Sequence, residues 1–143
     1  MTTFLIPADM TSHISQNTID AVSEEDATIM QSAIDAAVLE AQGYCSRYRV
    51  DQLFENIDSD PDYSRDSILL LHVKNMARWH FITLSNPTID YEDAELRYNQ
   101  AIKWLMGVQK GTIVPPSWPP LEEPEYGNKL FHISSRPKRN NHY

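Results

Sequence analysis

Apolar residues recur at intervals of three and four along two long stretches of the chain. Over residues 24–48 the series is Ala27, Met30, Ile34, Ala37, Val38, Ala41, Tyr44, Cys45 and Tyr48. Over residues 90–110 it is Tyr91, Ala94, Tyr98, Ala101, Ile102, Leu105 and Val108. This spacing places the apolar side chains on one face of an α-helix. The pattern therefore predicts two amphipathic helices over these ranges.

A third stretch, residues 66–84, is apolar on almost every side of a helix. Its apolar residues are Ile68, Leu69, Leu70, Leu71, Val73, Met76, Ala77, Trp79, Phe81, Ile82 and Leu84. A helix of this kind lies at the centre of a domain or at a contact between subunits. We therefore expect Leu70, Val73 and Trp79, together with Leu105 of the last helix, to build the core and the subunit contacts.

The residues at the ends of these stretches are typical of helix termini. Ser23 precedes three acidic residues, which suits an N-cap and the positive end of a helix dipole. Asp66 or Ser67 can cap the middle helix in the same way. Gly111 follows the last periodic stretch and is expected to end its helix as a C-cap.

The remaining residues up to Gly111 predict only short elements. Pro7 suits the first turn of a short helix. The segment "SQNTIDAV" is a short helix or a loop, and "DQLFEN" adds at most one turn. The sequence therefore predicts an all-α fold, a small bundle of three long helices plus one or two short ones, in a domain over residues 1–111.

Residues 112–143 lack a helical period and begin with a proline-rich segment. Five of the nine prolines lie in "IVPPSWPPLEEPEYG", residues 113–127. Proline pairs favour an extended conformation of about 3.1 Å per residue, which loses little entropy on binding. We therefore expect residues 112–143 to form an extended C-terminal arm that docks on another chain. The expected docking residues are Trp118, Phe131, Arg136, Lys138 and Arg139.

Charge is distributed unevenly along the chain. Residues 1–110 hold 17 acidic and 8 basic residues, a net charge of −9, whereas residues 111–143 hold 3 and 4, a net charge of +1. An acidic body argues against a protein that wraps DNA, because phosphate binding needs a basic face. The basic end "RPKRNNHY" can contact an acidic partner or phosphates, or serve only to solubilise the chain.

Candidate metal sites in the sequence lack the residues that their geometry requires. Asp58, Asp60 and Asp62 begin like a calcium loop, but a tyrosine replaces the turn glycine and a leucine replaces the last glutamate. His72 and His80 share a helix face without the glutamate of a metalloprotease motif. We therefore expect core or interface histidines and no metal or other cofactor.

Cys45 is the single cysteine and lies on the apolar stripe of the first long helix. We expect it to be a small core residue, because no local signature supports a thiol nucleophile. No phosphate loop or hydrolase motif is present in the sequence, so we expect no enzyme activity. An enzyme that used Cys45 or the histidines would require this thiol to be reachable by solvent.

The chain has neither an apolar run of about 18 residues nor a basic, apolar leader at its start. We therefore expect no membrane association and folding in the cytosol.

Two segments resemble the head-tail connector (adaptor) family of tailed phages, which includes the Mu-like neck proteins. "A-x-G-Y-C-S-R-Y" at 41–48 is similar to the family's "I-D-S-Y-L-x-x-R-Y", and "R-Y-N-Q-A-I-K-W-L-M-G-V-Q-K-G" at 97–111 to its "R-Y-x-x-A-I-x-W-L-x-x-I-x-x-G". The resemblance covers about residues 4–115. It departs from the family where "RDSILLL" lacks a preceding Pro-Pro pair and in the proline-rich segment after residue 115.

The resemblance implies a helical virion protein at the head-tail interface, assembled as a ring that is dodecameric in the family. Such a ring binds the portal protein and the next neck or tail protein, and genomic DNA passes through its channel without specific binding. In the family, C-terminal segments dock on the portal. The alternative is a cytosolic binding module whose Pro116 and Pro119 form a P-x-x-P ligand for an SH3-like partner.

Overall fold

Over the residues that the structure describes, the chain is all-α and has three long helices. A computed structural model describes residues 4–23, 28–55, 65–85 and 91–121. The long helices are α2 (Thr28–Tyr44), α4 (Ser67–Ser85) and α5 (Tyr91–Lys110). The short ones are the 3-10 helix η1 (Pro7–Ser12), α1 (Gln16–Ser23) and α3 (Val50–Leu53). The predicted class and the three long helices are confirmed, with boundaries that differ by a few residues.

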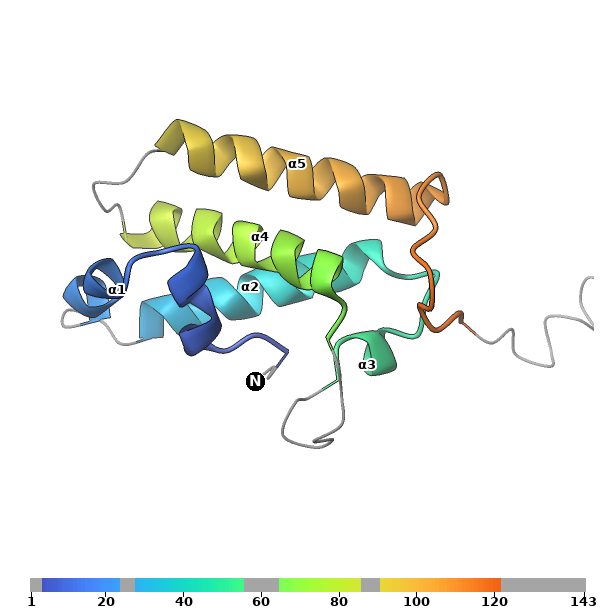
Figure 1. Ribbon diagram of the computed structural model, residues 1–143, viewed down its shortest axis with the longest axis horizontal. Helices are drawn as coiled ribbons and strands as arrows, with labels where there is room; N and C mark the ends of the chain where they lie inside the picture. Colours follow the sequence, from blue (N-terminus) through green and yellow to red (C-terminus); the bar gives the residue numbers. More distant parts are fainter. Residues whose placement is uncertain (1–3, 24–27, 56–64, 86–90, 122–143) are drawn as a thin grey trace, which may run out of the picture.

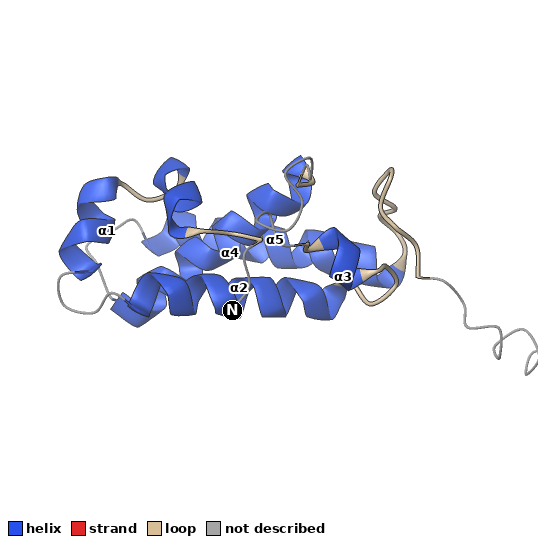
Figure 2. Ribbon diagram, turned by 90° about the horizontal axis from the view of Figure 1, so that it is seen from below, coloured by secondary structure: helices blue, strands red, loops and turns tan. Residues whose placement is uncertain are grey.

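The middle helix, α4, lies between the other two long helices (Figure 1). All three run along the long axis of the molecule, and in the view from below α2 runs along one edge of it (Figure 2). α1 packs against α2, while η1 contacts both α2 and α4. The apolar character of α4 on nearly all sides is therefore explained by its central position within one chain.

The core is formed where α4 meets its neighbours. α2 contributes small residues, Ala33, Ala37 and Ala41, which are fully buried and allow the two helix axes to approach closely. The η1 region adds larger apolar side chains. The largest fully buried side chains of the described residues are Phe4, Leu5, Met10, Ile34, Val38, Leu69, Val73, Met76, Phe81, Ile82, Leu105 and Val108. Each contributes about 1.5–3 kcal/mol relative to an exposed position.

α2 is shorter than the predicted helix over residues 24–48. It begins at Thr28, whereas Ser23 is the last residue of α1, and residues 24–27 lie outside the described part. It ends at Tyr44 because the chain then turns, with the Tyr48 amide donating to the Cys45 carbonyl at 3.0 Å. Tyr48 pairs with Pro120 in an isolated antiparallel bridge. A long-range contact thus overrides the helical spacing of the apolar residues.

Two of the predicted caps are present, one at the start of α4 and one at the end of α5. The Leu69 amide donates to Asp66 Oδ1 at 2.9 Å, so Asp66 is the residue that caps α4. Gly111 has φ 81°, and the amides of Thr112 and Ile113 donate to the Gly107 carbonyl at 3.0 and 3.1 Å. Gly111 therefore ends α5 in the left-handed conformation that glycine adopts without strain.

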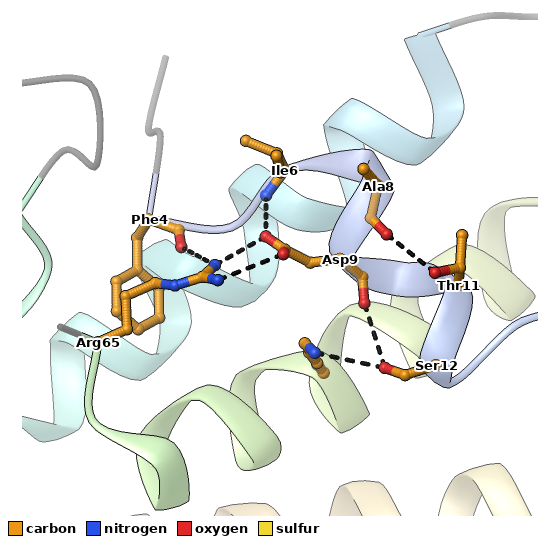
Figure 3. Close-up of polar contacts among 8 residues, drawn as sticks. Phe4, Ile6, Ala8, Asp9, Thr11, Ser12 and Arg65 are labelled. Carbon is orange, nitrogen blue, oxygen red and sulfur yellow. Dashed lines mark hydrogen bonds and ion pairs between the residues drawn. The ribbon is translucent and has the colours of Figure 1, made fainter. Parts of the chain in front are cut away.

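An ion pair fastens the N-terminal segment to the start of α4. Arg65 Nη1 donates to Asp9 Oδ2 at 2.7 Å and to the Phe4 carbonyl at 3.2 Å (Figure 3). The Ile6 amide donates to the same Asp9 oxygen at 3.0 Å. Burial opposes ionisation of Asp9, but the bonds from Arg65 and Ile6 outweigh it, so its pKa lies below the ordinary value.

Candidate interaction site

Residues 111–121, which follow α5, fold back onto the helical domain. In Figure 1 this segment passes from the end of α5 across the end of the bundle towards α3. The Arg49 amide donates to the Pro119 carbonyl at 2.9 Å, and the Leu121 amide donates to the Arg47 carbonyl at 3.2 Å. The domain was expected to end at Gly111, but residues 112–121 also pack on the helices.

Trp118 is the main contact between this segment and the domain. Its side chain is only 7% exposed and belongs to the core cluster. The indole meets Tyr48 and Trp104 edge to face, with ring centroids 5.1 and 5.7 Å apart, and Trp104 stacks on His72 at 4.7 Å. The expectation that Trp118 anchors on another chain is thus corrected, because its apolar surface is already covered by its own domain.

The proline-rich motif does not have the conformation of an SH3 ligand. Ser117, between Pro116 and Trp118, has φ 65° and lies in a turn. A polyproline helix requires φ near −75° at every residue, and SH3-like domains read two prolines on one side of such a helix. Together with the buried Trp118, this turn removes the structural basis of the P-x-x-P interpretation.

Of the residues expected in the core and at subunit contacts, two are fully buried. Val73 and Leu105 have no exposed surface, and Leu70 is partly buried against the core. Trp79 is partly exposed, and its ring lies 4.9 Å from Tyr91 and 5.6 Å from Tyr98. All four therefore pack within the chain. The other expected docking residues, Phe131, Arg136, Lys138 and Arg139, lie outside the described residues.

The apolar side chains that remain exposed lie mainly on the three long helices. They include one on α2, three on α4 and three on α5, each at least 40% exposed: Leu39, Ile68, Leu71, Leu84, Tyr91, Leu96 and Met106. Single exposed apolar residues are ordinary on a protein surface. Ile68 and Leu71, however, lie one helical turn apart and present adjoining apolar surface to solvent.

The two histidines of α4 make contacts within the bundle. His80 Nε2 lies 2.7 Å from Glu40 Oε2, and the Tyr98 hydroxyl donates to the other oxygen of the same carboxylate. His72 is stacked on Trp104. Within the described ranges no three acidic, histidine or cysteine side chains gather as metal ligands. Asp58, Asp60 and Asp62 of the calcium-like segment fall in residues 56–64, outside those ranges.

Cys45 is completely buried, which confirms its expected place in the core. Burial raises the pKa of its thiol to about 12. The thiolate, which is the nucleophilic form, is therefore scarcely populated near neutral pH. This environment is that of a structural cysteine and supplies no activated nucleophile.

A polar network that the sequence analysis did not identify joins α4 to α5. Arg78 Nη1 donates to Asp93 Oδ2 at 2.9 Å, and Arg97 Nε donates to the same carboxylate at 3.1 and 3.2 Å. The spacing of Asp93 and Arg97, four residues apart on one helix, is visible in the sequence. The participation of Arg78 depends on the packing of α4 against α5 and has no local signal.

Comparison of the chain with protein-family models, curated proteins and solved structures found no match. Among the helices that the structure describes, none is both long enough and apolar enough to cross a bilayer.

Proposed function

We propose that the chain is a structural adaptor of the tailed-phage neck. In this proposal it assembles as a ring beneath the portal, joins the portal protein to the next neck or tail protein, and leaves a channel through which DNA passes. The proposed location is the head-tail interface of the virion. The function requires no cofactor and no catalytic residue.

The main observation in support of the proposal is that hydrogen bonds connect the two segments that resemble the connector family. Arg47, from the segment at 41–48, donates from Nε to the Gln109 carbonyl at 2.8 Å and from Nη2 to the Lys110 carbonyl at 3.4 Å. These carbonyls close the segment at 97–111 and would otherwise lack partners at a helix end. The residues behind the resemblance therefore serve one shared structural purpose, which supports a common fold.

The surface of the helical body is also suited to assembly around DNA. The exposed apolar residues of α4 and α5 supply area that subunit contacts can bury. The net charge of −9 over residues 1–110 disfavours binding of this part of the chain to DNA phosphates. Both properties favour a ring whose channel lets DNA slide.

The proposed docking arm now begins after Leu121 and not after Gly111. Residues 112–121 stabilise the domain, so a truncation at Gly111 would remove Trp118 from the core. With that truncation, a loss of folding could not be told apart from a loss of docking. The arm proper is residues 122–143, with Phe131, Arg136, Lys138 and Arg139 as its proposed contacts to the portal or a neighbouring ring.

The experiment compares the full chain with a truncation after Leu121. Each is mixed with portal-containing heads, and bound protein is counted after sedimentation, while native mass spectrometry with isolated portal reports ring formation. We expect the full chain to form rings on the portal. The truncated protein should keep the thermal stability of the full chain and lose most binding to heads.

Two results would count against the proposal in different ways. If the full chain neither forms rings nor binds heads, the adaptor function itself is wrong. If the truncated protein binds heads as well as the full chain does, the adaptor function survives and the docking role of residues 122–143 is wrong. A full-length Leu121→Ala variant serves as the control, because it changes an exposed residue just before the arm.

A further inference from the structure

A pocket of about 320 Å³ opens between the end of η1 and the helices α4 and α5. Its lining residues are Ser12, His13, Leu71, Arg78, Asp93 and Arg97. Two of these are arginines, on a chain whose net charge is −8. A concentration of positive charge on an acidic body calls for a specific explanation.

The arginines share a single carboxylate. Arg78 and Arg97 both bond to Asp93, so the three residues together keep one positive charge in excess. The Arg78 side chain is 13% exposed, and its Nε is buried without a hydrogen-bond partner. A nitrogen buried in this way is out of reach of a ligand. The capacity of the pocket for an anion therefore rests on the excess positive charge of the two guanidinium groups that share Asp93.

Lys74 adds a third cation beside the pocket. Its Nζ lies 3.3 Å from the Ser12 hydroxyl, which in turn lies 2.8 Å from His13 Nδ1. Burial, and then the charges of Lys74, Arg78 and Arg97, lower the pKa of His13. Asp9, the one acid of η1, has Arg65 as its ion-pair partner, and the charge of Lys74 also contributes to lowering the pKa of Asp9. The field at the pocket is thus positive.

One wall of the pocket is apolar and continues onto the open surface. Leu71 lines the pocket with 48% of its surface exposed, and Ile68, one turn earlier on α4, is 53% exposed. A free inorganic anion gains nothing from apolar surface. A nucleic acid needs a broad basic face, which this acidic chain does not provide. A peptide that places an apolar side chain next to a carboxylate can use both parts of the site.

We propose that this pocket binds a glutamate or aspartate carboxylate from an acidic, partly apolar peptide segment of a partner protein. The carboxylate lies against Arg78 and Arg97 with Lys74 at the rim, and a neighbouring apolar side chain of the segment covers Leu71 and Ile68. Guanidinium groups suit this role because their planar donors match the two oxygens of a carboxylate.

The test is an NMR titration of the full chain with three probes. The probes are a synthetic peptide of alternating glutamate and leucine, the same peptide with glutamine for glutamate, and inorganic phosphate. We expect saturable shifts of amides in η1, α4 and α5 with the glutamate peptide. The glutamine peptide and phosphate should each bind at least about tenfold more weakly, the effect of losing about 1.4 kcal/mol.

Variants locate the effect in the pocket. Arg97→Gln and Lys74→Gln, tested separately, should each weaken binding of the glutamate peptide about tenfold, since each removes one charge-assisted contact. Lys103→Gln is the matched control. Lys103 is an exposed base on α5, as Arg97 is, but it does not line this pocket. Unchanged spectra of the free variants outside the pocket establish that they fold.

The proposal is overturned if the glutamate and glutamine peptides bind equally, or if the Lys74 and Arg97 substitutions have no larger effect than Lys103→Gln. It is also overturned if phosphate binds as tightly as the glutamate peptide, which would make the pocket a site for a free anion.

Discussion

The indole of Trp118 holds the segment after α5 against the domain. A buried tryptophan contributes a large apolar area, and here it also makes edge-to-face contacts with Tyr48 and Trp104. Its backbone neighbour Pro119 accepts the Arg49 amide. The side chain and the backbone pairing therefore act together to hold residues 111–121 against the helices.

We expect Trp118→Ala to lower the free energy of unfolding by about 3 kcal/mol, because it leaves a cavity between Tyr48 and Trp104. The measurement is urea unfolding followed by far-UV circular dichroism. Leu121→Ala, at a residue 58% exposed in the same segment, should change the free energy of unfolding by less than about 0.5 kcal/mol. Equal stability of Trp118→Ala and the wild type would refute the packing role.

Cys45 is predicted to be chemically silent in the folded protein. Its thiol is buried and has a pKa raised to about 12, so reaction requires local or global opening. A thiol-reactive dye should modify the native protein at least about 100-fold more slowly than the urea-unfolded protein. Comparable rates in the two states would mean that the thiol is reachable, and would reopen the possibility of an enzyme that uses it.

At the scale of elements, the ion pair between Asp9 and Arg65 ties η1 to the residues just before α4, and its strength depends on pH. The pKa of Asp9 is lowered in the fold, so its contribution is complete above the ordinary value of 3.8 and is lost as pH falls through the folded value. Asp9→Asn should cost about 2 kcal/mol of unfolding free energy at neutral pH.

The difference between Asp9→Asn and the wild type should therefore shrink as the pH drops below about 4, when the wild-type carboxyl also becomes neutral. The free energy of unfolding is measured for both proteins across this pH range. Asp51→Asn, at a residue whose side chain is 73% exposed, is the control and should have little effect at any pH. A cost for Asp9→Asn that does not vary with pH would rule out the charged interaction.

Two glycines on neighbouring elements should respond in opposite ways to alanine. Gly111 has φ 81°, and a Cβ there would lie 3.0 Å from Arg47 Nη1, so Gly111→Ala should destabilise by about 1–2 kcal/mol. Gly43 lies inside α2, and a Cβ there would meet nothing within 4 Å. Gly43→Ala should stabilise by about 0.5 kcal/mol. Thermal unfolding measures both changes, and a loss of stability in both variants would contradict this assignment.

The long helices could be predicted because their signal is local. The apolar run over residues 66–84 defines α4, and apolar residues three and four apart define α5, each within one or two residues. Asp66 and Gly111 mark ends that neighbouring residues determine. The end of α2 could not be predicted in the same way. Tyr48 continues the helical spacing, yet its backbone pairs with Pro120, and no local pattern records a partner so distant in sequence.

The same limit applies to the candidate sites. The sequence analysis placed Trp118 against another chain, and the structure buries it in its own domain, because burial within a chain and burial between chains use the same indole surface. Asp93 and Arg97 are spaced to interact on one helix, whereas Arg78 reaches them only because α4 packs beside α5. Interaction sites that combine elements therefore required the structure.

For the whole molecule, the charge distribution predicts weak interaction with DNA. The net charge of −8 repels a phosphate backbone, and the cations of the pocket between α4 and α5 are confined to one small area. Proteins with a basic face bind DNA non-specifically with Kd of about 10⁻⁴–10⁻⁶ M at physiological salt. We expect this chain to bind a short duplex more weakly than that range.

Fluorescence anisotropy of a labelled duplex, titrated with the full chain in low and physiological salt, measures this affinity. A channel protein that bound DNA tightly would slow its passage, so weak binding is what the proposed adaptor function requires. Lys74→Gln should leave the signal unchanged, since a pocket that accepts one carboxylate does not follow a phosphate backbone. Micromolar binding that weakens steeply with salt would instead indicate a continuous basic surface, and would count against both the proposed channel and the proposed peptide pocket.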